Sequence, residues 1–188
     1  PESKKLVIDD LSVTIKKGDI VGIIGKTGSG KSSLVDMIMG LLDPIKGSIR
    51  VDGVDLSKHK KDWYQLISHV PQFIHLSDSS ILENIAFGSS FNSLNYDKIV
   101  RVSKVAQIYD DIVQLPNGFE TKVGENGMKF SGGQIQRIGI ARALYKSSSI
   151  LIFDEATSAL DVKTEAKIIK EIERFDKKMT VIMIAHRI

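Results

Sequence analysis

A short glycine-rich segment carries the residues best suited to chemistry. Residues 25–32 read Gly-Lys-Thr-Gly-Ser-Gly-Lys-Ser and fit the pattern G-x-x-x-x-G-K-[ST] of phosphate-binding loops. Glycines let successive backbone N–H groups point at phosphate oxygens, and the start of a following helix adds partial positive charge there. In this pattern Lys31 reaches the β- and γ-phosphates, and the Ser32 hydroxyl binds Mg²⁺. The predicted nucleotide contacts are Gly25, Lys26, Thr27, Gly28, Ser29, Gly30, Lys31, Ser32 and Ser33.

The flanking sequence supplies the elements that such a loop requires. Residues 19–24 form a short apolar run typical of a buried strand, and residues 31–42 repeat apolar side chains at helical spacing. The order strand, loop, helix argues against the alternative of an incidental glycine-rich turn. The loop alone implies a magnesium nucleotide, ATP or GTP, and does not identify a family.

A pair of carboxylates follows a second apolar run. Residues 150–155 read Ile-Leu-Ile-Phe-Asp-Glu, so Asp154 and Glu155 emerge where a buried strand ends. Open α/β sheets bind ligands at the carboxyl ends of their strands. We therefore expect Asp154 to coordinate Mg²⁺, directly or from the second shell, and Glu155 to polarise the water that attacks the γ-phosphate. An exposed acidic turn is the alternative.

The segment at residues 130–134, Phe-Ser-Gly-Gly-Gln, resembles a known family motif. It is similar to the LSGGQ signature of ABC ATPases, with Phe130 in place of leucine. Ser131 is suited to cap a helix, and the two glycines let a second phosphate-bearing molecule approach the positive helix end. An ordinary capped helix is the alternative for this segment taken alone. The predicted nucleotide contacts here are Ser131, Gly132, Gly133 and Gln134.

The resemblance covers essentially the whole chain and implies further site residues. Gln72 resembles the glutamine that senses Mg²⁺ and the attacking water, and Asp161 ends a segment, residues 156–161, that resembles the D-loop. His186 resembles the switch histidine that contacts the γ-phosphate, although a histidine at a strand end is otherwise more often a satisfied polar residue. The expected catalytic residues are Glu155, His186, Gln72 and Lys31, and the expected metal-binding residues are Ser32, Gln72 and Asp154.

In ABC ATPases the signature completes the nucleotide site of a partner. The resemblance therefore implies a head-to-tail dimer with a second ABC ATPase domain, identical or different. Residues 115–118 and 121–127 resemble the stretch before the signature in ABC exporters, which meets the membrane domain and makes Glu125 a candidate contact. Residues 80–85 resemble the docking groove of a coupling helix, with Phe73 and Ile81 as candidate apolar contacts.

The resulting interpretation is ATP binding and hydrolysis that powers transport of an unidentified substrate across a membrane. It implies ATP and Mg²⁺ as cofactors, a transmembrane domain fused upstream, and a place on the cytoplasmic face of a membrane. Lipid, lipid-linked sugar, peptide and drug substrates stay open. One alternative is a soluble ABC ATPase acting on nucleic acid or ribosomes, and another is a regulatory module without catalysis. The latter is disfavoured because the expected catalytic residues are present.

Composition limits the classes that remain. The 188 residues are 42% hydrophobic, and the net charge of +3 arises from interspersed charges, which does not favour a nucleic acid partner. The basic run at residues 58–61 is interpreted as a solvated face. There is no cysteine, and the four histidines lack metal-ligand spacing. Apolar runs fall well short of the about 20 residues that a spanning helix needs, and the start at Pro1 favours a piece of a longer protein.

Periodicity and the resemblance together predict an α/β fold: a P-loop NTPase (RecA-like) core with N-terminal antiparallel strands and an inserted α-helical lobe, of the ABC ATPase type. Strands are predicted at residues 6–15, 19–24, 47–54, 66–70, 149–153 and 180–185. Helices are predicted at residues 31–42, 80–86, 97–107, 131–145 and 164–174. We expect a single domain over residues 1–188, with its core at about 1–72 and 140–188 and the lobe at about 73–139. No aromatic residue precedes Trp63, so the adenine-stacking aromatic of the family has no counterpart here, and the sequence does not distinguish ATP from GTP.

Overall fold

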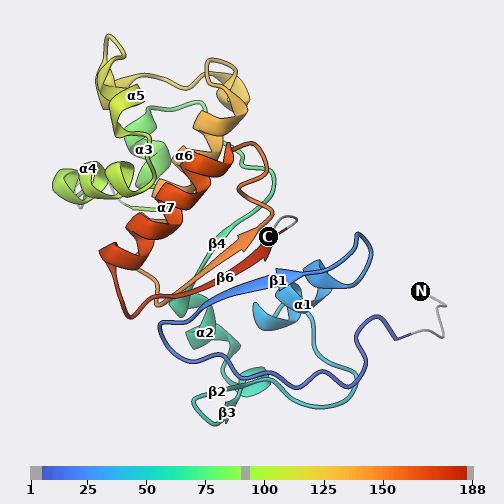
Figure 1. The fold of residues 1–188 in the computed structure, drawn as a ribbon. Helices are drawn as coiled ribbons and strands as arrows, with labels where there is room; N and C mark the ends of the chain where they lie inside the picture. Colours follow the sequence, from blue (N-terminus) through green and yellow to red (C-terminus); the bar gives the residue numbers. More distant parts are fainter. Residues whose placement is uncertain (1–5, 90–93, 186–188) are drawn as a thin grey trace.

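The computed structural model describes residues 6–89 and 94–185 (Figure 1). The strands are β1 (Ile20–Ile24), β2 (Arg50–Val51), β3 (Val54–Asp55), β4 (Ile67–Val70), β5 (Ile150–Asp154) and β6 (Thr180–Ala185). The helices are α1 (Lys31–Ile38), α2 (Lys60–Leu66), α3 (Ile81–Ile85), α4 (Tyr96–Val105), α5 (Tyr109–Val113), α6 (Gly132–Tyr145) and α7 (Val162–Phe175). Short 3₁₀ turns are η1 (Leu56–Lys58), η3 (Gly118–Glu120) and η4 (Glu125–Gly127). Within the described ranges, no helix has both the length and the hydropathy needed to cross a bilayer.

Four strands form a parallel sheet in the order β1-β6-β5-β4. Parallel neighbours need crossover connections, and here helices on both faces supply them. The register pairs Ile24 with Ala185 and Val70 with Phe153, one residue before the end of β5 at Asp154. All four carboxyl ends therefore lie at one edge of the sheet. The segments that begin at residues 25, 71 and 155 leave the sheet at this edge.

Side-chain alternation along the strands divides the core between the two faces of the sheet. Ile152 and Ile182 are buried with Val35 of α1, with Met39 directly after that helix and with Trp63 of α2. The Trp63 indole Nε1–H also donates a hydrogen bond to the carbonyl oxygen of Ile38 at 2.8 Å, so the buried polar atom of this side chain is satisfied. This smaller cluster holds the helix that follows the phosphate loop against the sheet.

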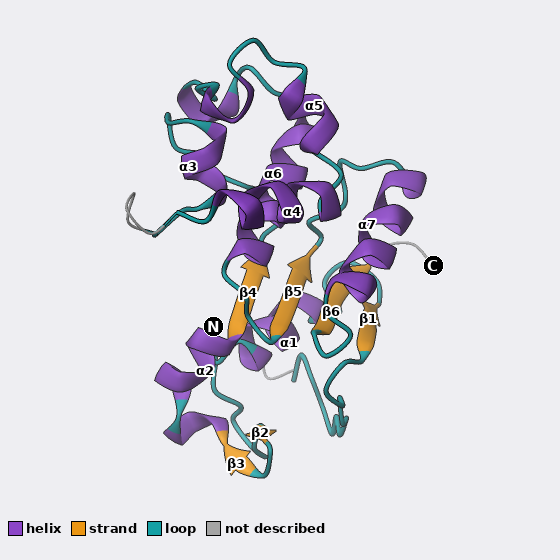
Figure 2. Ribbon diagram, turned by 90° about the vertical axis from the view of Figure 1, so that its left-hand side faces the viewer, coloured by secondary structure: helices purple, strands orange, loops and turns teal. Residues whose placement is uncertain are grey.

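The larger hydrophobic cluster joins the other face of the sheet to the helices α3, α4, α6 and α7. Leu151 and Phe153 of β5 belong to it, together with Ile99 and Val102 of α4 and Ile138 of α6. Each side chain of this kind stabilises the fold by about 1.5–3 kcal/mol when fully buried. Figures 1 and 2 show α3 to α6, called the lobe below, gathered at one end of the molecule and β2 and β3 at the other. One continuous cluster thus packs the lobe directly on the sheet.

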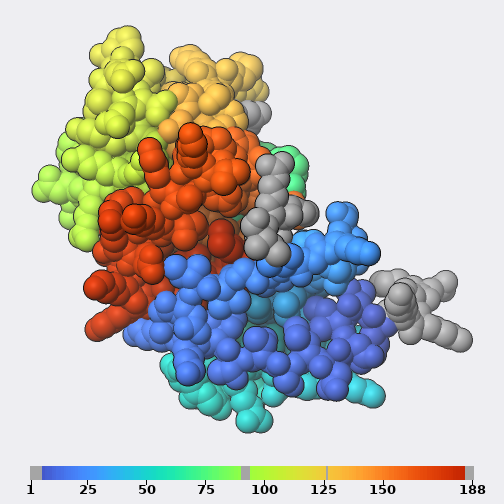
Figure 3. Space-filling view, viewed as in Figure 1, coloured from blue at the N-terminus to red at the C-terminus, as the bar shows by residue number. Residues whose placement is uncertain are grey.

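The N-terminal segment differs from the prediction. Residues 6–18 contain no strand, so the strands predicted at residues 6–15 are wrong for this segment. Alternating apolar residues form a strand only where a neighbour accepts their backbone hydrogen bonds, and this segment instead runs along the surface below β1 (Figure 3). Val7 lies against the phosphate loop, where its Cγ1 would be 2.6 Å from a Cβ added to Gly30.

Other differences have local causes. The strand predicted at residues 47–54 is an antiparallel β2–β3 hairpin, because Asp52 and Gly53 have φ angles of 49° and 82° and form a tight turn. Helix α1 ends at Ile38, earlier than predicted, since Gly40 adopts φ 76°. Helices α2 and α5, of 7 and 5 residues, were not predicted because they are too short to show a period. The other predicted strands and helices agree with the structure to within a few residues.

We expect Gly40→Ala to destabilise the domain by about 1–2 kcal/mol, because an L side chain disfavours the left-handed backbone at this position. The added Cβ itself has room, with its nearest neighbour, Leu56 Cδ2, at 3.6 Å. Urea unfolding measures the change. Gly22→Ala is the matched control, since Gly22 lies in β1 with nothing within 4 Å of an added Cβ and is absent from the glycines with positive φ. Equal effects of the two substitutions would show that backbone strain is not the cause.

Candidate nucleotide-binding and catalytic site

The phosphate loop connects β1 to α1 through a tightly curled backbone. Gly28 and Gly30 have φ angles of 78° and 91°, and the Ser29 N–H donates to the Lys26 carbonyl oxygen at 3.1 Å. A Cβ at Gly25 would lie 2.6 Å from Ser29 Oγ, so a side chain there would force the Ser29 hydroxyl to move. The curled loop expected from the sequence is present, and the positive φ angles of Gly28 and Gly30 are conformations that favour glycine.

Helix α1 presents an uncapped, positively polarised end to this loop. Gly30 precedes the helix without a side-chain cap, and the first turn contains no acidic residue. Lys31 is only 8% exposed, and its Nζ donates to the carbonyl oxygens of Gly25 at 2.9 Å and Lys26 at 3.1 Å. The Ser32 side chain is exposed and Ser33 is half-buried. The helix end and the ammonium together make this loop a strong site for phosphate oxygens.

The two predicted catalytic side chains next to the loop lie in contact. The Gln72 Nε2–H donates to Glu155 Oε2 at 3.0 Å, although the residues are 83 positions apart in the sequence. Gln72 follows β4 and Glu155 follows β5, and these strands are neighbours in the sheet. Glu155 has φ 51°, a left-handed backbone that is uncommon for a residue other than glycine and that turns the chain sharply after β5.

Asp154, the last residue of β5, has an environment suited to a cation. Burial is the largest cause that raises its pKa, and the nearby Glu155 and Asp36 carboxylates raise it further, while His69 opposes the shift. A raised pKa means that the carboxylate charge is disfavoured until a positive charge joins it. No group of three or more His, Cys, Asp or Glu side chains in the described part of the chain is arranged to hold a metal ion. Magnesium needs no such group, because one carboxylate, a hydroxyl and phosphate oxygens suffice. The oxygen donors Ser32, Gln72 and Asp154 therefore fit it.

The signature segment forms the start of α6. Ser131 caps this helix by accepting from the Gln134 N–H at 3.3 Å, and Gln134 Oε1 in turn accepts from the Ser131 N–H at 3.0 Å. This reciprocal capping box was only partly predicted, since the sequence indicated the serine cap. A Cβ at Gly133 would lie 3.3 Å from the Ala159 carbonyl oxygen, so the D-loop segment packs directly beneath the signature.

Asp161 caps α7 within its own chain. Its Oδ1 accepts from the backbone N–H groups of Lys163 and Thr164 at 3.0 Å each, and Oδ2 accepts from the Thr164 hydroxyl at 2.6 Å. The Thr164 side-chain hydrogen bond is the main reason that the pKa of Asp161 is lowered. The structure thus gives Asp161 a local role in addition to the contact across a dimer that the resemblance implies.

The predicted site residues divide into two groups in one copy of the chain. The loop at residues 25–33, Gln72, Asp154 and Glu155 gather at the carboxyl edge of the sheet, whereas residues 131–134 lie on the lobe. His186 lies outside the described residues. Strand β6 ends at Ala185, at the edge where the first group gathers.

The structure separates the apolar residues expected at the docking groove by their exposure. Ile81 is fully buried in the lobe core, so its prediction as an apolar docking contact is wrong. Phe73 and Phe87 are exposed, at 74% and 66%. Phe87 lies over the guanidinium of Arg142 at 5.2 Å. The sequence analysis missed this pair, because no motif or period links residues 87 and 142.

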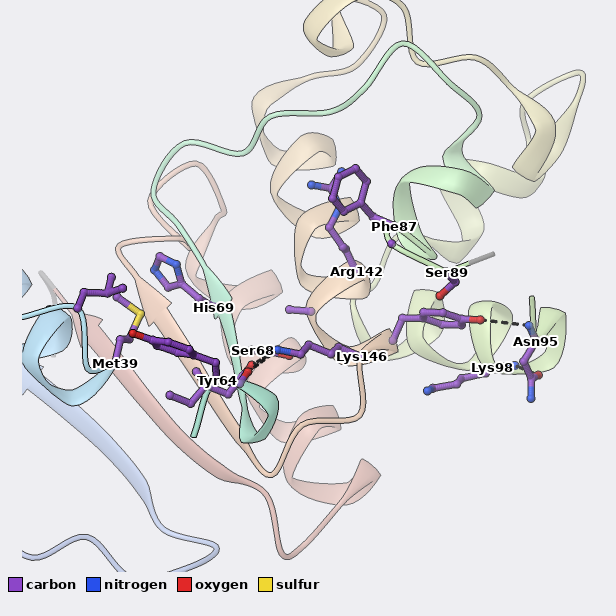
Figure 4. Close-up of a pocket in the computed structure, with 15 residues that line it drawn as sticks. Met39, Tyr64, Ser68, His69, Phe87, Ser89, Asn95, Lys98, Arg142 and Lys146 are labelled. Carbon is purple, nitrogen blue, oxygen red and sulfur yellow. Dashed lines mark hydrogen bonds between the residues drawn. The ribbon is translucent and has the colours of Figure 1, made fainter. Parts of the chain in front are cut away.

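Arg142 joins three parts of the lobe. Its Nε donates to the Asn84 carbonyl oxygen at 2.8 Å, Nη2 donates to Asn84 Oδ1 at 2.8 Å, and Nη1 donates to the His75 carbonyl oxygen at 3.0 Å. These contacts border a cavity of about 920 Å³ between the lobe and the sheet. Figure 4 shows Tyr64 and His69 on one side of this cavity and Phe87 and Arg142 on the other.

Comparison with known proteins decides the family. Residues 8–158 match the ABC transporter family. The chain belongs to this family. The ABC domain is 40% identical over 182 residues to an ATP-dependent lipid A-core flippase of Burkholderia pseudomallei (strain 1710b), a match that covers 96% of the chain and 30% of the flippase. It is 40% identical over 183 residues to ABC transporter B family member 28 of Arabidopsis thaliana, covering 97% of the chain and 26% of that protein.

A solved structure agrees with these matches. The ABC domain superposes on a bacterial Atm1-family ABC exporter with ATP bound, with a TM-score of 0.90 and 36% sequence identity, over 100% of the chain and 33% of the exporter. The predicted family and the ABC ATPase type of P-loop NTPase fold are thereby confirmed. The chain spans about a third or less of the length of these relatives.

We expect Asp154→Asn to abolish the Mg²⁺ dependence of nucleotide binding while raising the midpoint of thermal unfolding by about 1–3 °C. Because folding raises the pKa of Asp154, the charged carboxylate destabilises the fold at every pH above the ordinary aspartate pKa, and this cost disappears as the pH falls. The stabilisation should therefore be present at pH 7 and absent near pH 3. Calorimetry with and without Mg²⁺ at both pH values tests this. A lower midpoint at pH 7 would contradict the electrostatic argument.

Proposed function

We propose that this ABC domain binds and hydrolyses ATP to power transport across a membrane, as the nucleotide-binding part of an exporter or flippase. The observation that carries the proposal is the arrangement at one sheet edge, where Gln72 Nε2 lies 3.0 Å from Glu155 Oε2. Asp154 ends β5 at the same edge, and the loop that contains the buried Lys31 follows β1 there. The relatives named as a flippase and as an exporter support transport as the purpose of hydrolysis. The soluble alternative acting on nucleic acid or ribosomes has no comparable support.

The proposed chemistry is positioning and electrostatic stabilisation of phosphoryl transfer. The loop N–H groups and Lys31 hold the β- and γ-phosphates. Magnesium, bound through Ser32, Gln72 and Asp154, would neutralise negative charge on the phosphate oxygens. Glu155 orients and polarises the attacking water, and the Gln72 amide fixes the direction of its carboxylate. We assign to His186 a contact with the γ-phosphate, by resemblance.

We propose that a second ABC ATPase domain completes each site. Residues 131–134 lie on the lobe, whereas the phosphate loop lies at the sheet edge, so a head-to-tail arrangement lets the signature of one copy approach the phosphate held by the other. Two copies related by a twofold axis would form two equal sites. Ser131 and Gly133 then approach the γ-phosphate, Gly132 and Gln134 shape the same surface, and Asp161 lies near the contact between the copies.

We propose that the membrane part docks at the cavity between the lobe and the sheet, on the cytoplasmic face of the membrane. Phe87 lines this cavity with an exposed ring, which an apolar side chain from a transmembrane domain would cover. Phe73 and Glu125 are also exposed and are further candidate contacts. We propose the division expected from the sequence, with a core at about residues 1–72 and 140–188 and a helical part at about 73–139, which ends within the last helix of the lobe. Helix α6 crosses the proposed boundary and would transmit movement between the two parts.

Glu155→Gln should bind ATP as tightly as the unaltered protein and hydrolyse it at least about a hundredfold more slowly, because an amide cannot accept the proton of the attacking water. A closed, ATP-bound dimer should accumulate. Rates of phosphate release and analytical ultracentrifugation measure the two effects. Unaltered turnover would exclude Glu155 as the base.

Phe87→Ala in the full-length protein should leave the affinity for ATP within about twofold of that of the unaltered protein. It should lower transport-coupled ATP turnover by roughly tenfold, because it removes an exposed apolar contact and leaves the phosphate site intact. Glu125→Ala should act in the same direction. Ile45→Ala is the matched control, since Ile45 is an apolar residue that is 88% exposed and does not line the cavity. A parallel loss of ATP binding and coupled turnover would contradict the docking role.

A further inference from the structure

Asp111 on α5 binds two side chains of the signature helix at once. Its Oδ1 accepts from Gln134 Nε2 at 2.9 Å, and its Oδ2 accepts from Arg137 Nη1 at 3.0 Å. The pair of Asp111 and Arg137 is partly buried, with side-chain exposures of 33% and 18%. Hydrogen bonds to charged groups in such surroundings are among the stronger ones in proteins, because water competes for them less.

The two side chains held by Asp111 act on the first turn of α6. Gln134 uses its amide nitrogen for Asp111 and its Oε1 for the Ser131 N–H, so the carboxylate fixes one end of the capping box. Arg137 donates from Nε to the Gly133 carbonyl oxygen at 3.3 Å and from Nη1 to the Gln107 carbonyl oxygen, which ties the same turn to the end of α4. Without Asp111, Gln134 would regain rotamer freedom and the cap would loosen.

The ion pair of Asp111 and Arg137 also sets the net charge beside the first turn of α6. An isolated carboxylate close to the start of α6 would repel an approaching phosphate, whereas Arg137 compensates the charge of Asp111 at 3.0 Å. The two residues therefore stiffen the signature turn without placing a net negative charge beside it. An alanine at position 111 would remove both acceptor oxygens, so Gln134 and Arg137 would lose the partner that stiffens the turn.

We propose that Asp111 is a positioning residue for the signature, which holds Ser131 and Gly133 in the geometry that receives the γ-phosphate bound by a partner copy. This inference rests on the proposed dimeric ATPase. Asp111 does not touch the nucleotide and acts through Gln134 and Arg137. Because the signature serves the partner copy and the phosphate loop serves its own, loss of Asp111 impairs closure and hydrolysis but not the initial binding of ATP.

The test compares ATP binding with catalytic turnover in the full-length protein. We expect Asp111→Ala to bind ATP in the open state within about twofold of the unaltered protein and to show a kcat roughly tenfold lower. In a Glu155→Gln background, Asp111→Ala should also reduce the fraction of closed dimer that accumulates with ATP. Asp110→Ala is the matched control, since Asp110 lies in the same first turn of α5 with an exposed side chain, and it should leave both quantities unchanged.

Asp111→Asn separates positioning from simple destabilisation. The asparagine keeps the size of the side chain and one acceptor oxygen, so kcat should recover to within about threefold of the unaltered value. It also carries the test if the alanine variant does not fold. Unchanged kcat in both variants, or parallel losses of ATP binding and kcat, would overturn the positioning role. Absence of ATP hydrolysis in the unaltered full-length protein would instead overturn the proposed function on which this role rests.

Discussion

The parallel pairing of β1, β6, β5 and β4 is the constraint on which the site depends. Strands that run in one direction bring their carboxyl ends to a single edge, so three segments far apart in the sequence leave the sheet at the same edge. This is why Gln72 and Glu155 meet although 83 positions separate them. The large buried residues of β5, such as Phe153, hold the strand carrying the carboxylates in register. The positions of the side chains at the carboxyl edge therefore depend on the packing of the hydrophobic core beneath them.

Residues whose spacing carries a backbone requirement could be predicted from the sequence. Gly28 and Gly30 require positive φ angles, and Asp154 follows four apolar residues, so pattern and geometry are tied to each other. The segment at residues 6–15 could not be predicted in this way, because alternation says which side chains are apolar and not whether a partner strand is present. Ile81 shows the same limit. An apolar residue beside a suspected groove can equally be a core residue, and here it is completely buried.

Contacts between elements with no shared motif also escaped prediction. How α6 packs against the rest of the lobe determines the contacts of Arg142 with His75, Asn84 and Phe87. The same packing determines the contacts of Asp111 with Gln134 and Arg137. These pairs have sequence separations that differ from one contact to the next and follow no period. Such contacts are nevertheless what orients the motif residues, since Ser131 and Gln134 cap a helix whose direction the lobe determines. The motifs identify the reactive groups, and the packing between the elements that carry the motifs determines how these groups are oriented.

The continuous hydrophobic cluster that joins the lobe to the sheet has a mechanical consequence. Separating α4 and α6 from β5 would expose large aliphatic side chains such as Ile99, Ile138 and Leu151 to water, at a cost of several kcal/mol. Relative movement of the two parts is thus restricted to small sliding displacements in which the buried surfaces stay covered. A displacement of the lobe that keeps this cluster buried would therefore also shift β5 and the residues that follow it. The lobe and the sheet are thus expected to move largely together, with only small displacements between them.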